Sequence, residues 1–124
     1  MLFMKKADFR SICPLSSSLD MVGDKWSLLI IRDLFMGKTT YSDFLSSSES
    51  IATNVLVARL KSLKEYGIID VRKDEKRKNI KYYFLTDNGK DLLPILANMA
   101  LWYEKHVHAE PEPISKHLTD LMMK

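Results

Sequence analysis

The sequence predicts an α+β fold that is mostly α-helical and contains one small β-hairpin. Two observations predict it. Several stretches space apolar residues three and four positions apart, which is typical of amphipathic helices. Two β-prone runs, 68–71 and 80–85, flank a polar turn at about residues 74–79. With 124 residues, 46% of them hydrophobic, the chain can bury a core of ordinary size.

Residues 51–66 show the clearest helical pattern. At about 100° per residue, three leucines fall within about 60° of one another on this helix: Leu56, Leu60 and Leu63. The opposite side is mostly polar, so one face belongs to the core and the other is free to contact a partner. We expect Ser50 or Thr53 to cap the start of the helix and Gly67 to end it in a left-handed conformation.

Positive charge is concentrated around the turn of the hairpin. Residues 72–81 contain six basic and two acidic residues, a net +4, whereas the formal charge of the whole chain is +3. Taken alone, a lysine-rich turn is more often a solvated hairpin. A helix followed directly by a cationic hairpin, however, is how a winged helix contacts duplex DNA, since the hairpin tip suits phosphates or the minor groove. We therefore predict a winged helix-turn-helix.

Two short helices are predicted before this motif. Pro14 breaks the chain, and the first helix then runs to about Gly23, with three candidate caps: Ser16, Ser17 and Ser18. Asp24 is expected to cap a second helix that ends at Gly37. This second helix is apolar over much of its circumference, which favours a place at the centre of the domain.

A third helix and a turn complete the helix-turn-helix. Residues 38–40 are short enough for a single β-bridge, and residues 41–45 are predicted to form a brief helix. The serine-rich segment 46–50 is too short to separate two domains. It matches the connection between the two helices of the motif.

Two apolar helices are predicted after the hairpin. One runs from about 87 to 106, capped by Thr86 and kinked by Pro94, and an amphipathic segment follows at 114–123. Both can simply cover their own domain. We favour burial against a second copy of the chain, because a two-fold dimer would also place two contact helices on a pseudo-palindromic DNA site. The candidate interface residues are Leu96, Met99, Trp102, Tyr103, Leu118 and Leu121.

Several short motifs follow one another at a specific spacing. They are Cys13-Pro14, the run GDKWSLLIIRDL at 23–34, Gly37, LVARLKSL at 56–63, GII at 67–69, YFLT at 83–86, and Gly89. Together they resemble the HxlR family of bacterial and archaeal winged helix-turn-helix regulators over about residues 13–106. The resemblance implies a homodimeric transcription factor whose protomers contact each other through N-terminal and C-terminal helices.

The expected organisation is a single winged helix domain over residues 1–124. Residues 13–86 would form the helix-turn-helix and the wing. Residues 87–124, together with the N-terminal segment, would contribute to dimerisation.

The helix geometry and the resemblance together indicate the DNA contacts. In the contact helix, we expect Asn54 to pair with adenine and apolar side chains to touch thymine methyl groups. The major-groove candidates are Thr53, Asn54, Val57, Ala58 and Lys61. The wing candidates for phosphates or the minor groove are Arg72, Lys76, Arg77 and Lys78. Arg59 lies beside the core stripe and can instead pair with an acid across the fold.

This chain departs from the family pattern at the third helix and at the start of the contact helix. Thr40, Ser46 and Ser47 stand where the family usually has basic residues, and Ala52 stands in place of a serine. We therefore expect the charged wing to make a larger share of the phosphate contacts.

Cys13 is a candidate redox sensor. The resemblance implies this role, because some members sense oxidants or electrophiles through a cysteine near the N-terminus. Since the chain has one cysteine, oxidation could join two protomers or form an adduct with a small molecule. The alternative is a small apolar residue packed at the edge of the domain.

Other function classes are disfavoured by the residues present. A thiol enzyme would need a base near Cys13, but the three histidines lie in the C-terminal segment: His106, His108 and His117. Their spacing does not suit zinc, so we expect no metal and no cofactor. A winged helix that binds another protein, without specific DNA binding, is the remaining alternative. Large exposed apolar residues on the contact helix would favour that alternative.

No membrane partner is expected. The sequence has no run of about 18 apolar residues, and residues 1–10 lack a signal-peptide pattern. We expect a cytoplasmic protein.

Overall fold

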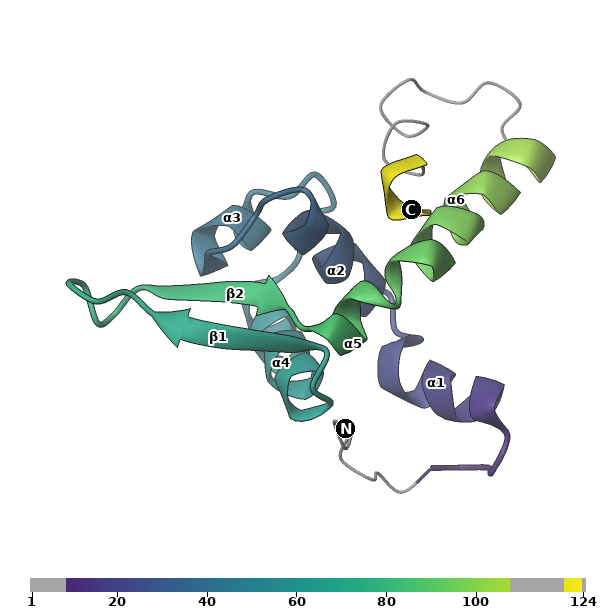
Figure 1. The fold of residues 1–124 in the computed structure, drawn as a ribbon, viewed down its shortest axis with the longest axis horizontal. Helices are drawn as coiled ribbons and strands as arrows, with labels where there is room; N and C mark the ends of the chain where they lie inside the picture. The colour runs from purple at the N-terminus through teal and green to yellow at the C-terminus, as the bar shows by residue number, and fades with distance from the viewer. Residues whose placement is uncertain (1–8, 108–119, 124) are drawn as a thin grey trace. The chain divides into compact units, whose positions relative to one another are not determined.

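The computed structural model describes residues 9–107 and 120–123 (Figure 1). The chain divides into two compact units, 1–89 and 90–124. The first unit contains α1 (Pro14–Val22), α2 (Ser27–Phe35), α3 (Tyr41–Leu45), α4 (Thr53–Glu65), β1 (Ile69–Lys73) and β2 (Lys81–Leu85). The short helix α5 (Asp87–Lys90) lies at its end, and α6 (Leu93–His106) belongs to the second unit. The predicted α+β class is confirmed, and so is the predicted order in which a helix is followed directly by the hairpin.

The core of the first unit lies between α2, α3, α4 and the start of the hairpin. The three predicted leucines of α4 are buried, as are Ile30 and Ile31 of α2 and Phe44 of α3. Burial of each such side chain stabilises the fold by about 1.5–3 kcal/mol relative to exposure. The apolar stripe predicted from residues 56, 60 and 63 is therefore the face that fixes α4.

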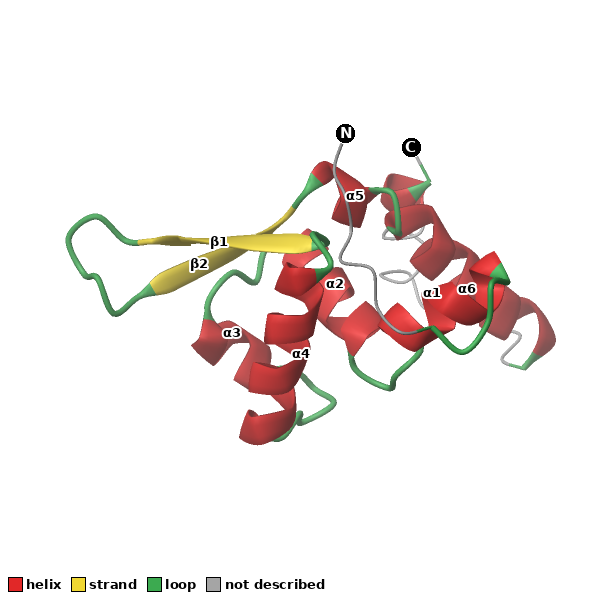
Figure 2. Cartoon of the chain, turned by 90° about the horizontal axis from the view of Figure 1, so that it is seen from below, coloured by secondary structure: helices red, strands yellow, loops and turns green. Residues whose placement is uncertain are grey.

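The two strands form an antiparallel hairpin with a fixed register. Ile69 pairs with Leu85, Val71 with Tyr83, and Lys73 with Lys81. The N–H of Tyr83 also donates to the carbonyl of Thr39 at 2.8 Å. This hydrogen bond is what the structure has in place of the predicted β-bridge at 38–40, and it joins the hairpin to the segment before α3. In Figure 2 the turn of the hairpin projects beyond α3 and α4.

Some predicted helix boundaries are confirmed. Gly67 has φ +74°, the left-handed conformation expected after α4. Asp24 was predicted to cap α2, but the N-cap of this helix is Trp26 and has no side-chain cap. The Asp24 carboxylate instead accepts hydrogen bonds from the N–H groups of Trp26 and Ser27 at 2.9 and 3.0 Å and closes the turn before the helix. Thr86 accepts from the N–H of Gly89 at 3.2 Å and thereby caps α5.

The predicted caps of α4 and α1 are also wrong. Ala52 is the N-cap of α4 and offers no side-chain cap, while Thr53 is the first residue of the helix and Ser50, with φ +57°, belongs to the turn. At α1, Cys13 occupies the cap position and the three serines lie inside the helix, because Pro14 is already suited to the first helical turn. The Ser18 hydroxyl donates back to the carbonyl of Leu15 instead.

The prediction of one kinked helix over 87–106 is also wrong. The chain leaves the helical conformation after Lys90, and α6 begins at Leu93 with Pro94 in its first turn. A proline has no N–H and its ring clashes with the carbonyl four residues earlier, here that of Lys90. Both costs vanish in a first turn, where the N–H would lack a helical partner anyway.

The second unit presents exposed apolar side chains along α6. Met99, Trp102 and Tyr103 are exposed, whereas Leu96 is half-buried. An open depression of about 490 Å³ lies on the helix surface. It is lined by Ile95, Asn98, Met99, Trp102 and Tyr103. Leu121 is exposed, and Leu118 lies outside the described residues. Of the predicted helix 114–123, residues 120–122 are described and helical.

Within the described ranges, no helix is both long enough and apolar enough to span a bilayer.

Candidate nucleic-acid interface

The exposed side of α4 contains all five residues predicted to face the major groove. Thr53, Asn54, Ala58 and Lys61 are exposed, and Val57 is 52% exposed. The buried leucines hold the helix against the core, and the opposite face is open to solvent. A helix with one buried stripe and a polar, partly cationic outer face can enter the major groove of DNA.

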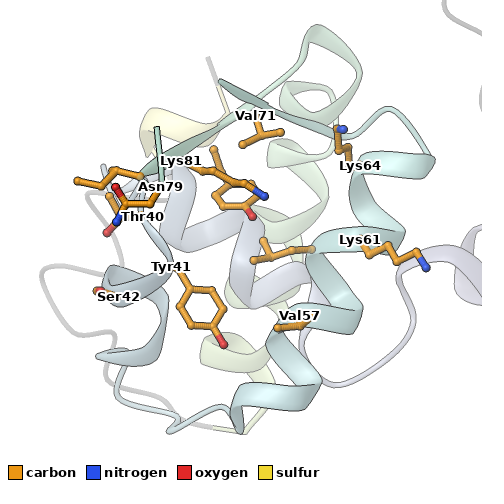
Figure 3. A pocket seen from close by; sticks show the side chains of 12 residues that line it. Thr40, Tyr41, Ser42, Val57, Lys61, Lys64, Val71, Asn79 and Lys81 are labelled. Carbon is orange, nitrogen blue, oxygen red and sulfur yellow. The ribbon is translucent and has the colours of Figure 1, made fainter. Parts of the chain in front are cut away.

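A groove of about 670 Å³ lies beside this face, between α3, α4 and the hairpin (Figure 3). Three lysines line it, Lys61 and Lys64 of α4 and Lys81 of β2. Figure 3 shows Lys61 and Lys64 along α4, on the opposite side of the groove from Thr40 and Asn79. The remaining lining residues are Tyr41, Ser42, Val57, Leu60, Val71, Ile80 and Tyr83. Such a cationic groove can follow an anionic backbone.

The DNA contacts predicted from the sequence do not include three residues that line this groove: Lys64, Lys81 and Tyr41. Lys64 follows Lys61 by one helical turn, and that spacing could have indicated it. Lys81 shares a strand face with Tyr83, which the alternation of side chains along a strand could also have indicated. Which face of the hairpin meets α4 depends on tertiary packing.

The predicted wing residues are divided between two places. Arg72 pairs with Tyr82 across the strands, on the face opposite to Val71 and Tyr83 of the groove. Its guanidinium lies over the Tyr82 ring, 5.2 Å from the centroid. The three other predicted cations are exposed in the turn: Lys76, Arg77 and Lys78. Arg72 thus contacts Tyr82 on the strands, whereas the three turn cations form the tip of the hairpin.

The turn before α4 is fixed by an ion-pair network around Arg32. Its guanidinium lies 2.8 Å from Glu49 and 2.8 Å from Asp33, whose side chain is buried. The Ser47 hydroxyl donates to Glu49 at 2.9 Å. The Arg32 guanidinium holds the pKa of Glu49 at about 2, and the hydrogen bond with Glu49 in turn raises the pKa of Arg32. Ser47 therefore helps to set the geometry of the helix-turn-helix.

Glu49→Gln is expected to lower the free energy of unfolding at pH 7 by about 1 kcal/mol. The expected loss is this small because the Glu49 side chain is 35% exposed and solvent weakens its ion pair. The folded pKa of Glu49 lies below its ordinary value of 4.5, so this stabilisation is complete above pH 4.5 and disappears as the pH falls toward 2. Urea unfolding of wild type and variant at pH 7 and pH 3 measures the difference. Glu75→Gln, at an exposed residue of the wing, is the control. An equal stability difference at both pH values would contradict the assignment.

A capping box positions α3 at the edge of the groove. The Asp43 carboxylate accepts from the N–H groups of Thr39 and Thr40 at 3.0 and 3.1 Å, and the Thr40 hydroxyl accepts from the N–H of Asp43 at 3.2 Å. The hydrogen bond from Thr39 is the main cause of a lowered pKa at Asp43. Thr40 is thus a cap as well as a lining residue.

Arg59 pairs with an acid across the fold, which was the alternative to a DNA contact for this residue. Its guanidinium lies 3.5 Å from the carboxylate of Asp24. Partial burial raises the pKa of Asp24, but hydrogen bonds from Ser27 and Trp26 together with the Arg59 charge outweigh it and leave the pKa lowered. This pair links α4 to the start of α2.

Among the residues that the structure describes, no cluster of three His, Cys, Asp or Glu side chains could hold a metal ion. Cys13 is exposed at the start of α1.

The fold and this surface define a winged helix-turn-helix protein. The family model for HxlR-like helix-turn-helix proteins matches residues 21–111, so the chain belongs to that family. The resemblance seen in the sequence motifs is thereby confirmed.

Relatives and solved structures agree with this assignment. An uncharacterised HTH-type transcriptional regulator of Synechocystis is 32% identical over 88 residues, which are 71% of this chain and 65% of the relative's length. A crystal structure of PA1607, described as a candidate transcription factor, is similar with a TM-score of 0.73 and 38% identity, and the match covers 83% of this chain and 71% of that one. The redox regulator HypR in its oxidised form is similar with a TM-score of 0.68 and 28% identity, over 76% and 97% of the two chains.

Proposed function

We propose that the protein is a transcriptional regulator that binds specific double-stranded DNA sites as a homodimer. The observation that supports this most is the arrangement in one compact unit of an exposed polar helix face, a groove with three lysines and a cationic hairpin tip. The relatives named as HTH-type transcriptional regulators support the same function. Its ligand is chromosomal DNA, so we place the protein in the cytoplasm.

In the proposed complex α4 lies in the major groove. Thr53 and Asn54 offer hydrogen bonds to base edges or backbone, and Val57 is an apolar contact for a thymine methyl group. The groove lysines and the hairpin tip contact phosphates on either side, which fixes the register of the helix. The core of a protein–protein interface is depleted of charged residues such as lysine, whereas this face carries Lys61 and Lys64 among residues that are mostly polar or small.

The exposed apolar surface of α6 supports the homodimer. Met99, Trp102 and Tyr103 are large side chains that remain in contact with solvent in a single copy. Aromatic residues and methionine are enriched in interfaces. A two-fold dimer predicts that sites selected from random duplexes are palindromic, with half-sites about one helical turn apart. Selection of single, asymmetric half-sites would contradict the dimer.

Replacing Arg77 and Lys78 together with Ala is expected to weaken binding to all DNA sequences alike. Each cation that neutralises a phosphate contributes about 0.9 to the slope of log K against log salt, so the slope should become shallower by about two per protomer, or about four for the homodimer. Fluorescence anisotropy with a labelled duplex across a salt series measures it. Replacing Lys25 and Lys90 with Ala, two exposed lysines that do not line the groove, is the charge-matched control. An unchanged slope in the first variant would remove the turn from the interface.

We also propose that Cys13 makes the regulator sensitive to oxidants. Its side chain is exposed, and the similarity to the redox regulator HypR supports the role. With one cysteine per chain, a peroxide would oxidise one thiolate to a sulfenic acid, which the thiol of a second protomer converts to a disulfide with loss of water. Treated wild type should run as a covalent dimer and change its DNA affinity. Cys13→Ser should bind DNA and show neither effect; an identical response in both proteins would end the proposal.

A further inference from the structure

The turn of the hairpin is organised by one carboxylate. One oxygen of Asp74 accepts hydrogen bonds from the N–H groups of Lys76 and Arg77 at 3.0 and 2.8 Å. Its other oxygen accepts from the hydroxyl of Tyr82 at 3.1 Å. The N–H group of Arg77 is the main cause of a lowered pKa at Asp74, so the carboxylate is ionised at neutral pH.

The contacts of Asp74 continue onto the strands. The Tyr82 ring lies beneath the guanidinium of Arg72, its direct partner in the strand register. The N–H of Asp74 donates to the carbonyl of Ile80 at 2.9 Å and closes the base of the turn. Asp74, Tyr82 and Arg72 thus form one connected set, which we call the wing clamp. It lies on the hairpin face opposite to the groove.

We propose that Asp74 is a positioning residue for DNA binding, which holds the backbone of Lys76 and Arg77 so that the cationic tip is ordered before it meets phosphates. The inference rests on the proposed DNA-binding function and adds the way in which the wing is prepared for it. A flexible turn would have to be ordered on binding, and that ordering would reduce affinity.

The positioning role of Asp74 can be distinguished from the effect of its charge, because the two predict opposite changes in DNA affinity. Asp74 is an anion beside a surface that approaches phosphates, so removing its charge alone should strengthen DNA binding. Removing its hydrogen bonds should weaken binding by releasing the tip. The neighbouring Glu75 provides a matched comparison, because it is exposed in the same turn and makes none of the clamp contacts.

The experiment compares Asp74→Ala, Asp74→Asn and Glu75→Ala in the full chain, with binding to a random-sequence duplex of about 30 base pairs across a salt series. Asp74→Ala should lower affinity by about tenfold and make the salt slope shallower by about two for each protomer bound. Glu75→Ala should keep the slope and bind at least as tightly as wild type. Asp74→Asn keeps an oxygen for the two N–H groups and should restore affinity to the wild-type level or above.

Amide hydrogen exchange of the free proteins provides a readout that needs no DNA. The amides of Lys76 and Arg77 should lose protection in Asp74→Ala and keep it in Glu75→Ala. Equal gains in affinity for both alanine variants, or unchanged protection in Asp74→Ala, would overturn the clamp. An Asp74→Asn variant as weak as Asp74→Ala would overturn it as well. If wild type shows no salt-dependent binding, the proposed function fails, and the exchange data alone then decide whether Asp74 orders the turn.

Discussion

Replacing both Lys61 and Lys81 with Glu is expected to reduce DNA affinity by about a hundredfold or more. The two residues come from α4 and β2 and line the same groove. In the proposed complex the change removes two phosphate contacts per protomer and adds two anions that repel the DNA backbone. In a homodimer both effects occur twice. Anisotropy titrations at about 0.1 M salt, where the screening length is about 10 Å, measure the loss.

The control for this variant replaces Lys25 and Lys90 with Glu. It changes the formal charge by the same amount, at exposed lysines that do not line the groove. We expect it to weaken binding by less than about tenfold, through long-range electrostatics that salt screens. Equal losses in the two variants would mean that net charge, and not the groove, determines binding.

Phe44→Ala is expected to have the largest effect on stability, a loss of about 4 kcal/mol in the free energy of unfolding. The Phe44 side chain is 1% exposed and its ring packs edge-on against Tyr83, with the centroids 6.0 Å apart. This contact joins α3 to the hairpin at Tyr83, which itself lines the groove. Small domains are stable by about 5–15 kcal/mol, and the variant would therefore be close to unfolding.

Phe84→Ala is the matched comparison for Phe44→Ala. Phe84 has the same side chain on the other face of β2, where it is 43% exposed. Its truncation should cost less than about 1 kcal/mol. Urea unfolding at one fixed protein concentration measures both variants, because association would make the stability depend on concentration. Similar losses in the two variants would show that the core is not where the structure places it.

The elements that could be predicted from the sequence are those with a strong local signal. The stripe Leu56, Leu60 and Leu63 fixes the buried face of α4 by periodicity alone, and the basic turn stands out by charge. Gly67 was predictable because few residues other than glycine tolerate its left-handed conformation. The position of Arg59 around the helix axis did not decide whether it contacts DNA or an acid, because its pairing with Asp24 is a tertiary contact.

The features that sequence reasoning missed depend on competition or on tertiary packing. Several serines near α1 and α4 could act as caps, and the choice among them depends on where the neighbouring turn places the backbone. Pro94 is compatible with a kink or with a first turn, and the break after Lys90 shows which one this chain adopts. Lys81 lies on the groove side of the hairpin and Arg72 on the opposite side. This difference follows from the register of the strands and from the face of the hairpin that packs on α4.

The salt dependence of wild-type binding to duplex DNA tests the central claim most directly. In the proposed complex six cations per protomer contact phosphates: Lys61, Lys64 and Lys81, which line the groove, and Lys76, Arg77 and Lys78, which are exposed in the turn. At about 0.9 per contact, the slope of log K against log salt is predicted to be about −5 for one protomer and steeper for a dimer. A slope near zero in a folded protein would contradict a DNA-binding surface built from α4, the groove and the wing.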